Sequence, residues 1–277
     1  MEQIRKQRKT GHPTEQRSKA NRRRQHKQRF LIVLGITFLL GFLAGLFVGS
    51  KKVQPVNFVM ESSAETSENS SDSSKDTKKN IDNSKLPWNL QLVNYEYPLE
   101  ETFKPETLAE ADNTYETDSR IADAVKKMIS DARQTEDVRI IAISAFRDYD
   151  YQMELFEDKV QRLQKEHGYS VKKAREEAAT VVAYPGTSEH QLGLALDLVD
   201  ARHVKLDESQ ENTAAYQWLS RHCAEYGFIV RYPNGKTDIT GIIYEPWHFR
   251  YVGEEAAKVI MEKNITLEEY LADYYEF

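Results

Sequence analysis

The pattern of apolar and polar positions first isolates one long apolar segment near the N-terminus. Residues 30–49 contain no charged side chain over twenty positions, which is long enough to cross the hydrocarbon core of a bilayer. Many more basic residues precede this segment than follow it, so we expect one membrane helix over residues 30–50 with the N-terminus inside the cell. A cleaved signal peptide is the alternative, because small residues at 44–45 and 49–50 could form a cleavage site.

A polar stretch extends from residue 61 to residue 85. Residues 61–85 are mainly Ser, Asp, Glu, Asn, Thr and Lys, with no aromatic and almost no aliphatic side chain. Such a segment cannot bury enough apolar surface to offset the entropy lost on ordering. We therefore predict a disordered linker over residues 51–86, which holds a folded domain, residues 87–277, away from the membrane.

Apolar residues at helical spacing predict helices within this domain. Ile121, Val125 and Met128 recur at that spacing behind Thr117 or Asp118, either of which can cap a helix. Further helices are predicted over residues 149–182 with an interruption at 168, and over residues 212–226, 254–263 and 267–274.

Other stretches have the composition or alternation of strands. They are residues 138–144, 194–199, 228–232, 237–244 and 249–252, with a strand or extended segment over 90–99. Pro233-Asn-Gly235 predicts a hairpin that joins the third and fourth of these strands. Together these elements predict an α+β fold, in which helices flank a small and mainly antiparallel sheet.

Charge and cysteine content narrow the functional classes. Residues 1–29 hold 11 Lys and Arg residues and only two acidic ones, while the whole chain has a net charge of −6. A basic tail on an acidic body does not fit a nucleic-acid-binding protein with a broad basic face. The single cysteine, Cys223, excludes an intrachain disulfide and a structural zinc site built from several thiolates.

Candidate chemistry gathers in two short motifs. Asp197 lies on the strand face opposite Leu196, and an inward carboxylate needs a partner, either a metal ion or a salt bridge. His190 precedes it by an odd number of residues, so the chain must turn at Gly193 if both are to face one site; otherwise His190 is a structural histidine.

The second motif is Glu245-Pro-Trp-His248, in which the central pair interrupts regular strand pairing and lets both outer side chains point into one cavity. Two histidines, an aspartate and a glutamate are the inventory of a catalytic zinc site with an open position for water. Four other acidic or histidine residues lie near these motifs in sequence: Glu189, Asp200, His203 and His222. We interpret Asp200, His203 and His222 as surface or structural groups.

The spacing Ser188-x-His190-x-x-Gly-x-Ala-x-Asp197, followed by Glu245-x-x-His248, resembles the VanY-type zinc D,D- and L,D-carboxypeptidases, which trim peptidoglycan stem peptides. The likeness extends over about residues 90–253. It departs from the usual family pattern at residues 145–146, where Gly-Tyr is common, and at residue 95, where Lys is common.

The resemblance implies a Hedgehog/DD-peptidase-like fold with Zn²⁺ bound by His190, Asp197 and His248. It also implies that Glu245 is the general base. The resemblance further implies that Arg147 lies in the active-site cleft, where its guanidinium binds a carboxylate or stabilises the oxyanion. It implies that Gln152 and Ser188 either bind the substrate or support the residues that do.

We therefore expect a membrane-anchored zinc carboxypeptidase that removes the C-terminal D-Ala from stem peptides, with its catalytic domain outside a Gram-positive cell. Whether the reaction is D,D- or L,D-specific stays open. The alternatives are a D-Ala-D-Ala dipeptidase, a wall endopeptidase of the same fold, or a non-catalytic module that binds wall peptides.

Overall fold

The computed structural model describes residues 81–135 and 137–276, and a four-stranded antiparallel sheet forms their centre. Its strand order is β3-β4-β6-β5. The strands are β3 (Ile140–Ser144), β4 (Ala195–Asp200), β6 (His248–Tyr251) and β5 (Phe228–Val230). Every residue of β4 is buried, and Leu196 and Leu198 belong to one core cluster with residues of α2 and α5. The pairing of β4 with β6 sets Asp197 directly opposite His248.

A separate two-stranded sheet, β1 (Leu108–Asp112) with β2 (Tyr115–Asp118), was not predicted. Its turn residues, Asn113 and Thr114, both have positive φ, at 47° and 75°. Two positive φ values give the backbone twist that a tight hairpin requires. The sequence signal is weak because neither turn residue is glycine.

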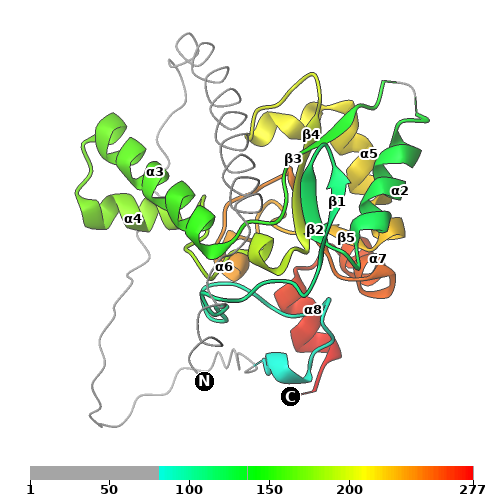
Figure 1. Ribbon diagram of the computed structural model, residues 1–277, viewed down its shortest axis with the longest axis horizontal. Helices are drawn as coiled ribbons and strands as arrows, with labels where there is room; N and C mark the ends of the chain where they lie inside the picture. Colours follow the sequence, from blue (N-terminus) through cyan, green and yellow to red (C-terminus); the bar gives the residue numbers. More distant parts are fainter. Residues whose placement is uncertain (1–80, 136, 277) are drawn as a thin grey trace, which may run out of the picture. The chain divides into compact units, whose positions relative to one another are not determined.

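Helices surround the central sheet. In Figure 1, α2 (Ala122–Ala132), α5 (Ala214–His222) and α7 (Glu254–Lys263) lie on one side of it. On the other side α3 (Tyr149–His167) and α4 (Val171–Ala179) project as a hairpin. The remaining elements are α6 (Thr237–Thr240), α8 (Leu267–Tyr274) and the 3-10 helices η2 (Asn83–Lys85), η3 (Glu189–Leu192), η4 (Glu208–Asn212) and η5 (Cys223–Tyr226).

The projecting hairpin has a small core of its own. Phe156 and Val160 of α3 pack against Ala174 and Ala178 of α4. Gly168 ends α3 in the left-handed conformation, as the predicted interruption requires. The α+β class and the paired helices are therefore confirmed.

Two local predictions are wrong. Thr117 and Asp118 belong to β2, and the residue that precedes α2 is Ile121, which makes no side-chain capping bond. The carboxylate of Asp118 instead accepts hydrogen bonds from the backbone and side chain of Arg120.

The predicted hairpin through Pro233-Asn-Gly235 is also absent from the described residues. Residues 237–240 form the helical turn α6, which ends at Gly241 with a φ of 75°. The strand β5 therefore pairs with β6, which lies in the middle of the sheet rather than at its edge.

The N-terminal described residues pack on the domain. Ile81, Leu86 and Leu90 are buried against α7 and α8, so the packed part of the chain begins before the predicted domain start at residue 87. No helix in the described part of the chain is long and apolar enough to span a membrane. The predicted basic tail and membrane helix, residues 1–50, lie outside the described residues.

Candidate metal centre

Three side chains converge at one face of the sheet, two from the adjacent strands β4 and β6 and one from the 3-10 helix η3. The Oδ1 atom of Asp197 lies 3.4 Å from Nε2 of His190 and 3.3 Å from Nδ1 of His248. One potential ligand atom from each residue lies within 4.8 Å of the other two. The predicted ligand set is therefore brought together, with all three side chains buried.

The turn expected between His190 and Asp197 is the 3-10 helix η3, which ends at Gly193. Gly193 has a φ of 71°, and a Cβ atom there would lie 2.8 Å from the backbone nitrogen of Asp118. Glycine is the residue that combines this φ with so close an approach. The turn therefore directs His190 to the same side of the sheet as Asp197.

His190 is held as a neutral metal ligand would be. Its Nδ1 donates a hydrogen bond to the carbonyl oxygen of Ala145 at 2.7 Å, which leaves the lone pair of Nε2 facing Asp197. Burial, together with the positive charge of Arg147, lowers the pKa of His190 to about 4. Nε2 of His190 and Oδ1 of Asp197 are both buried without a hydrogen-bond partner among the described residues. Such orphaned atoms are costly, and a cation between them would satisfy both.

His248 has the opposite orientation. Its Nδ1 faces Asp197 and lies 3.8 Å from Oε2 of Glu245, while its Nε2 lies 3.5 Å from Oε2 of Glu189. Burial lowers the pKa of His248, but the nearby carboxylates of Asp197 and Glu189 favour its protonated form, outweigh burial and raise the pKa to about 9. The site without metal therefore holds a proton that a metal ion would displace.

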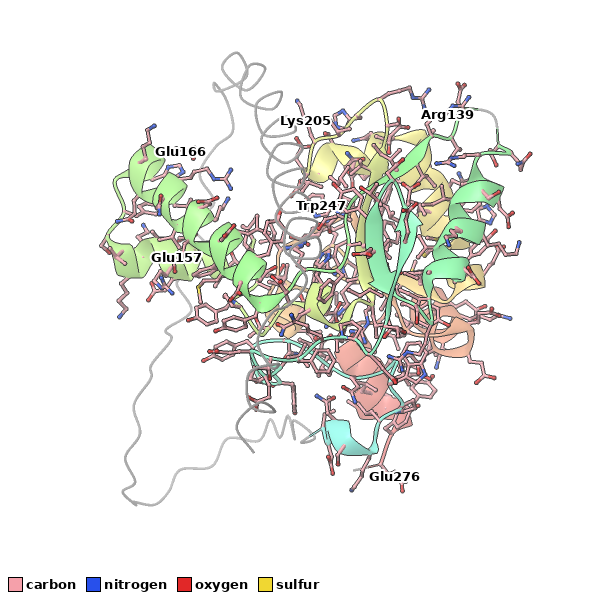
Figure 2. The ribbon with its side chains drawn as sticks, viewed as in Figure 1. Arg139, Glu157, Glu166, Lys205, Trp247 and Glu276 are labelled. Carbon is pink, nitrogen blue, oxygen red and sulfur yellow. The ribbon has the colours of Figure 1, made fainter. Side chains whose placement is uncertain are left out.

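Glu245 lies at the edge of this centre. Burial raises the pKa of its carboxyl group to about 8, although the positive charges of His248 and Arg147 oppose the shift. The backbone nitrogen of His248 donates to the carbonyl of Glu245, and the carbonyl of Trp247 accepts from Leu198 on β4. This turn fixes the segment beside the sheet, where Figure 2 places Trp247. A carboxyl group with a pKa near neutrality is suited to proton transfer.

Arg147 contacts the oxygen of Asp197 that faces away from the histidines. Its Nη2 lies 3.0 Å from Oδ2 of Asp197, its Nε donates to Ser144 and its Nη1 donates to Gln152. Gln152 in turn donates to the carbonyl of Ala183. Gln152 therefore holds Arg147 in place, and its predicted contact with substrate stays a prediction.

Ser188 immediately precedes η3, and its side chain is buried. Its predicted substrate-side role also stays a prediction. The groups interpreted as structural lie elsewhere: Asp200 pairs with Arg202, and His203 contacts Ser209. His222 of α5 contacts Glu225, so this interpretation agrees with the structure.

Comparison with known proteins now decides the family. Residues 114–254 match the family model described as VanY, D-alanyl-D-alanine carboxypeptidase. The chain belongs to this family. A D-alanyl-D-alanine carboxypeptidase of Enterococcus faecalis is 42% identical over 185 residues, which are 66% of this chain and 66% of that protein.

Two solved structures of VanY-like proteins resemble this one. A mutant of the vancomycin-resistance D,D-pentapeptidase VanY, in complex with Zn(II), is 39% identical with a TM-score of 0.60, over 67% of this chain and 99% of that one. The LD-carboxypeptidase LdcB is 36% identical with a TM-score of 0.60, over 69% of this chain and 89% of that one. One of these two proteins is thus named as a D,D-enzyme and the other as an LD-enzyme.

Sequence reasoning did not assign a role to Glu189 in this VanY-family site. Its carboxylate is fully buried, and its Oε1 accepts hydrogen bonds from Arg231 and Arg250. Burial raises the pKa of Glu189, but the two guanidinium groups outweigh it and hold the pKa far below its usual range. The sequence did hold one signal for this role. Arg250 lies two residues after His248 on a predicted strand, so both side chains lie on one face, and a buried arginine there requires an acidic partner.

Proposed function

We propose that this VanY-family protein is a zinc-dependent carboxypeptidase that removes the C-terminal D-Ala from peptidoglycan stem peptides. The proposal rests on two buried atoms that have no hydrogen-bond partner among the described residues, Nε2 of His190 and Oδ1 of Asp197, beside Nδ1 of His248. Two imidazoles and one carboxylate suit zinc, and the Zn(II) complex of a related D,D-pentapeptidase supports that choice.

In this proposal His190, Asp197 and His248 hold the metal through these atoms. Bound zinc would supply a Lewis acid that lowers the pKa of a water ligand and polarises the peptide carbonyl. Glu245 accepts the proton of the attacking water and later returns it to the departing amine. In the metal-free protein burial raises the pKa of this carboxyl group to about 8. The positive charge of a bound metal ion would lower that pKa, which favours the carboxylate that accepts a proton near neutral pH.

Arg147 supplies the positive charge for the substrate. Three of the five N–H groups of a guanidinium serve Ser144, Gln152 and Asp197. The remaining donors are available for the terminal carboxylate of a stem peptide or for the oxyanion of the transition state. The Arg147 side chain is 13% exposed, which supports access from solvent.

Mass spectrometry of stem peptides tests the proposal. The zinc-loaded protein would be incubated with a pentapeptide ending in D-Ala-D-Ala, with a tetrapeptide ending in one D-Ala, and with the free D-Ala-D-Ala dipeptide. Shortening of the pentapeptide identifies a D,D-carboxypeptidase, and shortening of the tetrapeptide alone identifies an L,D-enzyme. Cleavage of the dipeptide alone would replace the proposal with a dipeptidase.

Glu245→Gln is the matched control for this assay. The amide keeps the shape of the side chain but cannot accept the proton of water, so zinc should stay bound while product formation falls by at least ~10²-fold. Activity equal to that of the unchanged protein would refute the role of Glu245.

We further propose that residues 30–50 anchor the protein in the membrane of a Gram-positive cell, with the catalytic domain outside. The apolar, uncharged segment and the basic residues before it support this topology. Protease treatment of intact protoplasts should digest the catalytic domain and spare a tag at the N-terminus. Protection of both parts would contradict the topology.

A further inference from the structure

A buried network of charged side chains lies behind His248, on the side away from Asp197. Glu189 is its centre, because Oε1 accepts from Nε of Arg231 and from Nη1 of Arg250, each at 2.7 Å. Arg231 also donates two hydrogen bonds to Glu268, at 2.9 and 2.7 Å. Two acidic groups thus neutralise two guanidinium groups; Glu189, Arg231 and Arg250 are buried, whereas the Glu268 side chain is 13% exposed.

The two oxygens of Glu189 have different partners. Oε1 serves both guanidinium groups, whereas Oε2 has no hydrogen-bond partner among the described residues and lies 3.5 Å from Nε2 of His248. That Nε2 is likewise buried without a hydrogen-bond partner in this part of the chain. A proton on Nε2, with a small closing movement, would satisfy both atoms at once.

We propose that Glu189 is a positioning residue that keeps the proton of His248 on Nε2 and thereby presents the lone pair of Nδ1 to the metal. This inference rests on the proposed zinc-dependent function. Metal-ligating histidines commonly donate their second ring N–H to a carboxylate or a carbonyl, which fixes the tautomer and the ring orientation. The site uses both solutions: the carbonyl of Ala145 holds His190, and the carboxylate of Glu189 holds His248.

The network also ties His248 to both ends of the folded domain. Nη2 of Arg250 donates to the backbone carbonyls of Asn89 and Gln91 in the segment that precedes β1. Arg231 reaches Glu268 on α8. The carboxylate of Glu189 is therefore held by two guanidinium groups that are themselves fixed to separate parts of the fold, which leaves Oε2 with one direction in which to point.

Glu189→Gln inverts the hydrogen-bonding polarity at His248 while it keeps the side-chain shape. The two guanidinium groups only donate, so the amide oxygen must take the place of Oε1. The NH₂ group then faces Nε2 of His248 and donates to it, which places the ring proton on Nδ1, the atom that the metal requires. We expect the zinc dissociation constant to rise by roughly 10–100-fold.

Glu268→Gln and Glu269→Gln are the matched controls on α8. Glu268 binds Arg231 but does not contact His248, and Glu269 pairs with Lys236 outside the network. Both substitutions replace a paired carboxylate by an amide on the same helix. We expect the first to weaken zinc binding less than Glu189→Gln does, and the second to leave zinc affinity unchanged.

The experiment combines two readouts on the full chain. Competition with a chromophoric chelator gives the zinc affinity of each variant, and long-range ¹H–¹⁵N spectra of histidine side chains give the tautomers in the zinc-loaded, unchanged protein. The expected spectrum has protons on Nδ1 of His190 and on Nε2 of His248. The second readout needs no variant, so a Glu189→Gln protein that fails to fold does not remove the test.

The outcomes separate this inference from the proposed function. A proton on Nδ1 of His248 in the zinc-loaded protein, or unchanged zinc affinity in folded Glu189→Gln, would overturn the role of Glu189 while peptide cleavage stands. A protein that neither binds zinc nor shortens any stem peptide would overturn the proposed function itself.

Discussion

Replacing Gly193 by alanine tests how tightly the turn of the metal centre is built, and Gly168 provides a matched comparison. Both glycines have left-handed backbones, with φ values of 71° and 67°. A Cβ atom at Gly193 would lie 2.8 Å from the backbone nitrogen of Asp118 and 2.9 Å from Cγ of Pro105. A Cβ atom at Gly168 would have no neighbour within 4 Å among residues 81–135 and 137–276. The two substitutions therefore share the conformational cost and differ in the steric one.

The magnitudes follow from these contacts. An alanine in the left-handed region costs roughly 1–2 kcal/mol. The reduced freedom of the unfolded chain offsets about 0.4–1 kcal/mol of that cost. Gly168→Ala should accordingly lower the free energy of unfolding by about 1 kcal/mol. Gly193→Ala should lower it by a further ~1–3 kcal/mol, because backbone atoms of β2 must move to make room.

Urea denaturation of both variants, each without metal, measures this difference directly. Zinc titration adds a second readout, since Gly193 lies between His190 and Asp197 whereas Gly168 lies in the distant α3–α4 hairpin. Gly193→Ala should weaken zinc binding, and Gly168→Ala should not. Equal losses of stability in the two variants would refute the steric argument, because only the conformational cost would then remain.

Three further predictions concern separate parts of the domain. The pKa of His248 in the metal-free protein is raised to about 9, so at pH 7 its proton opposes zinc binding. Zinc affinity should therefore rise by up to ~10-fold per pH unit and level off above that pKa. Zinc affinity that does not change with pH would contradict this prediction. Burial raises the pKa of Cys223 to about 12, so iodoacetamide at pH 8 should modify it, by mass spectrometry, only after unfolding. Thr266→Ala removes the capping box of α8 and should cost about 1 kcal/mol in urea denaturation, where an unchanged midpoint would argue against the cap.

Helical periodicity predicted the last two helices of the domain at their observed bounds, Glu254–Lys263 and Leu267–Tyr274. Their apolar faces repeat over about two to three turns, so each residue adds to one consistent pattern. The candidate metal ligands were also identifiable, because His190 and Asp197 lie in one short motif and His248 follows Glu245 after two residues. In both cases the determining residues are neighbours in sequence.

The wrong prediction of a hairpin at residues 233–235 shows a limit of turn signals in the sequence. Pro233-Asn-Gly235 does turn the chain, but the residues after it form α6 instead of a returning strand. There Lys236 ion-pairs with Glu269 of α8, and Thr240 bonds within its own turn. The strand that pairs with β5 is β6, and β6 is held in the sheet by its pairing with β4 on the other side. Such competition between strands is tertiary and leaves no trace in the turn sequence.

In the candidate metal centre, too, local motifs leave part of the structure undetermined. A histidine nitrogen can bind a metal ion only if the ring proton lies on the other nitrogen. Ala145, which accepts the proton of His190, lies 45 residues away from it, and the guanidinium groups that fix Glu189 lie 42 and 61 residues from that carboxylate. The motifs therefore identify which side chains could bind a metal, whereas the fold determines which nitrogen of each ring is free to do so. A chain with the same motifs but without Arg231 and Arg250 would keep its three ligands and lose the groups that aim Glu189 at His248.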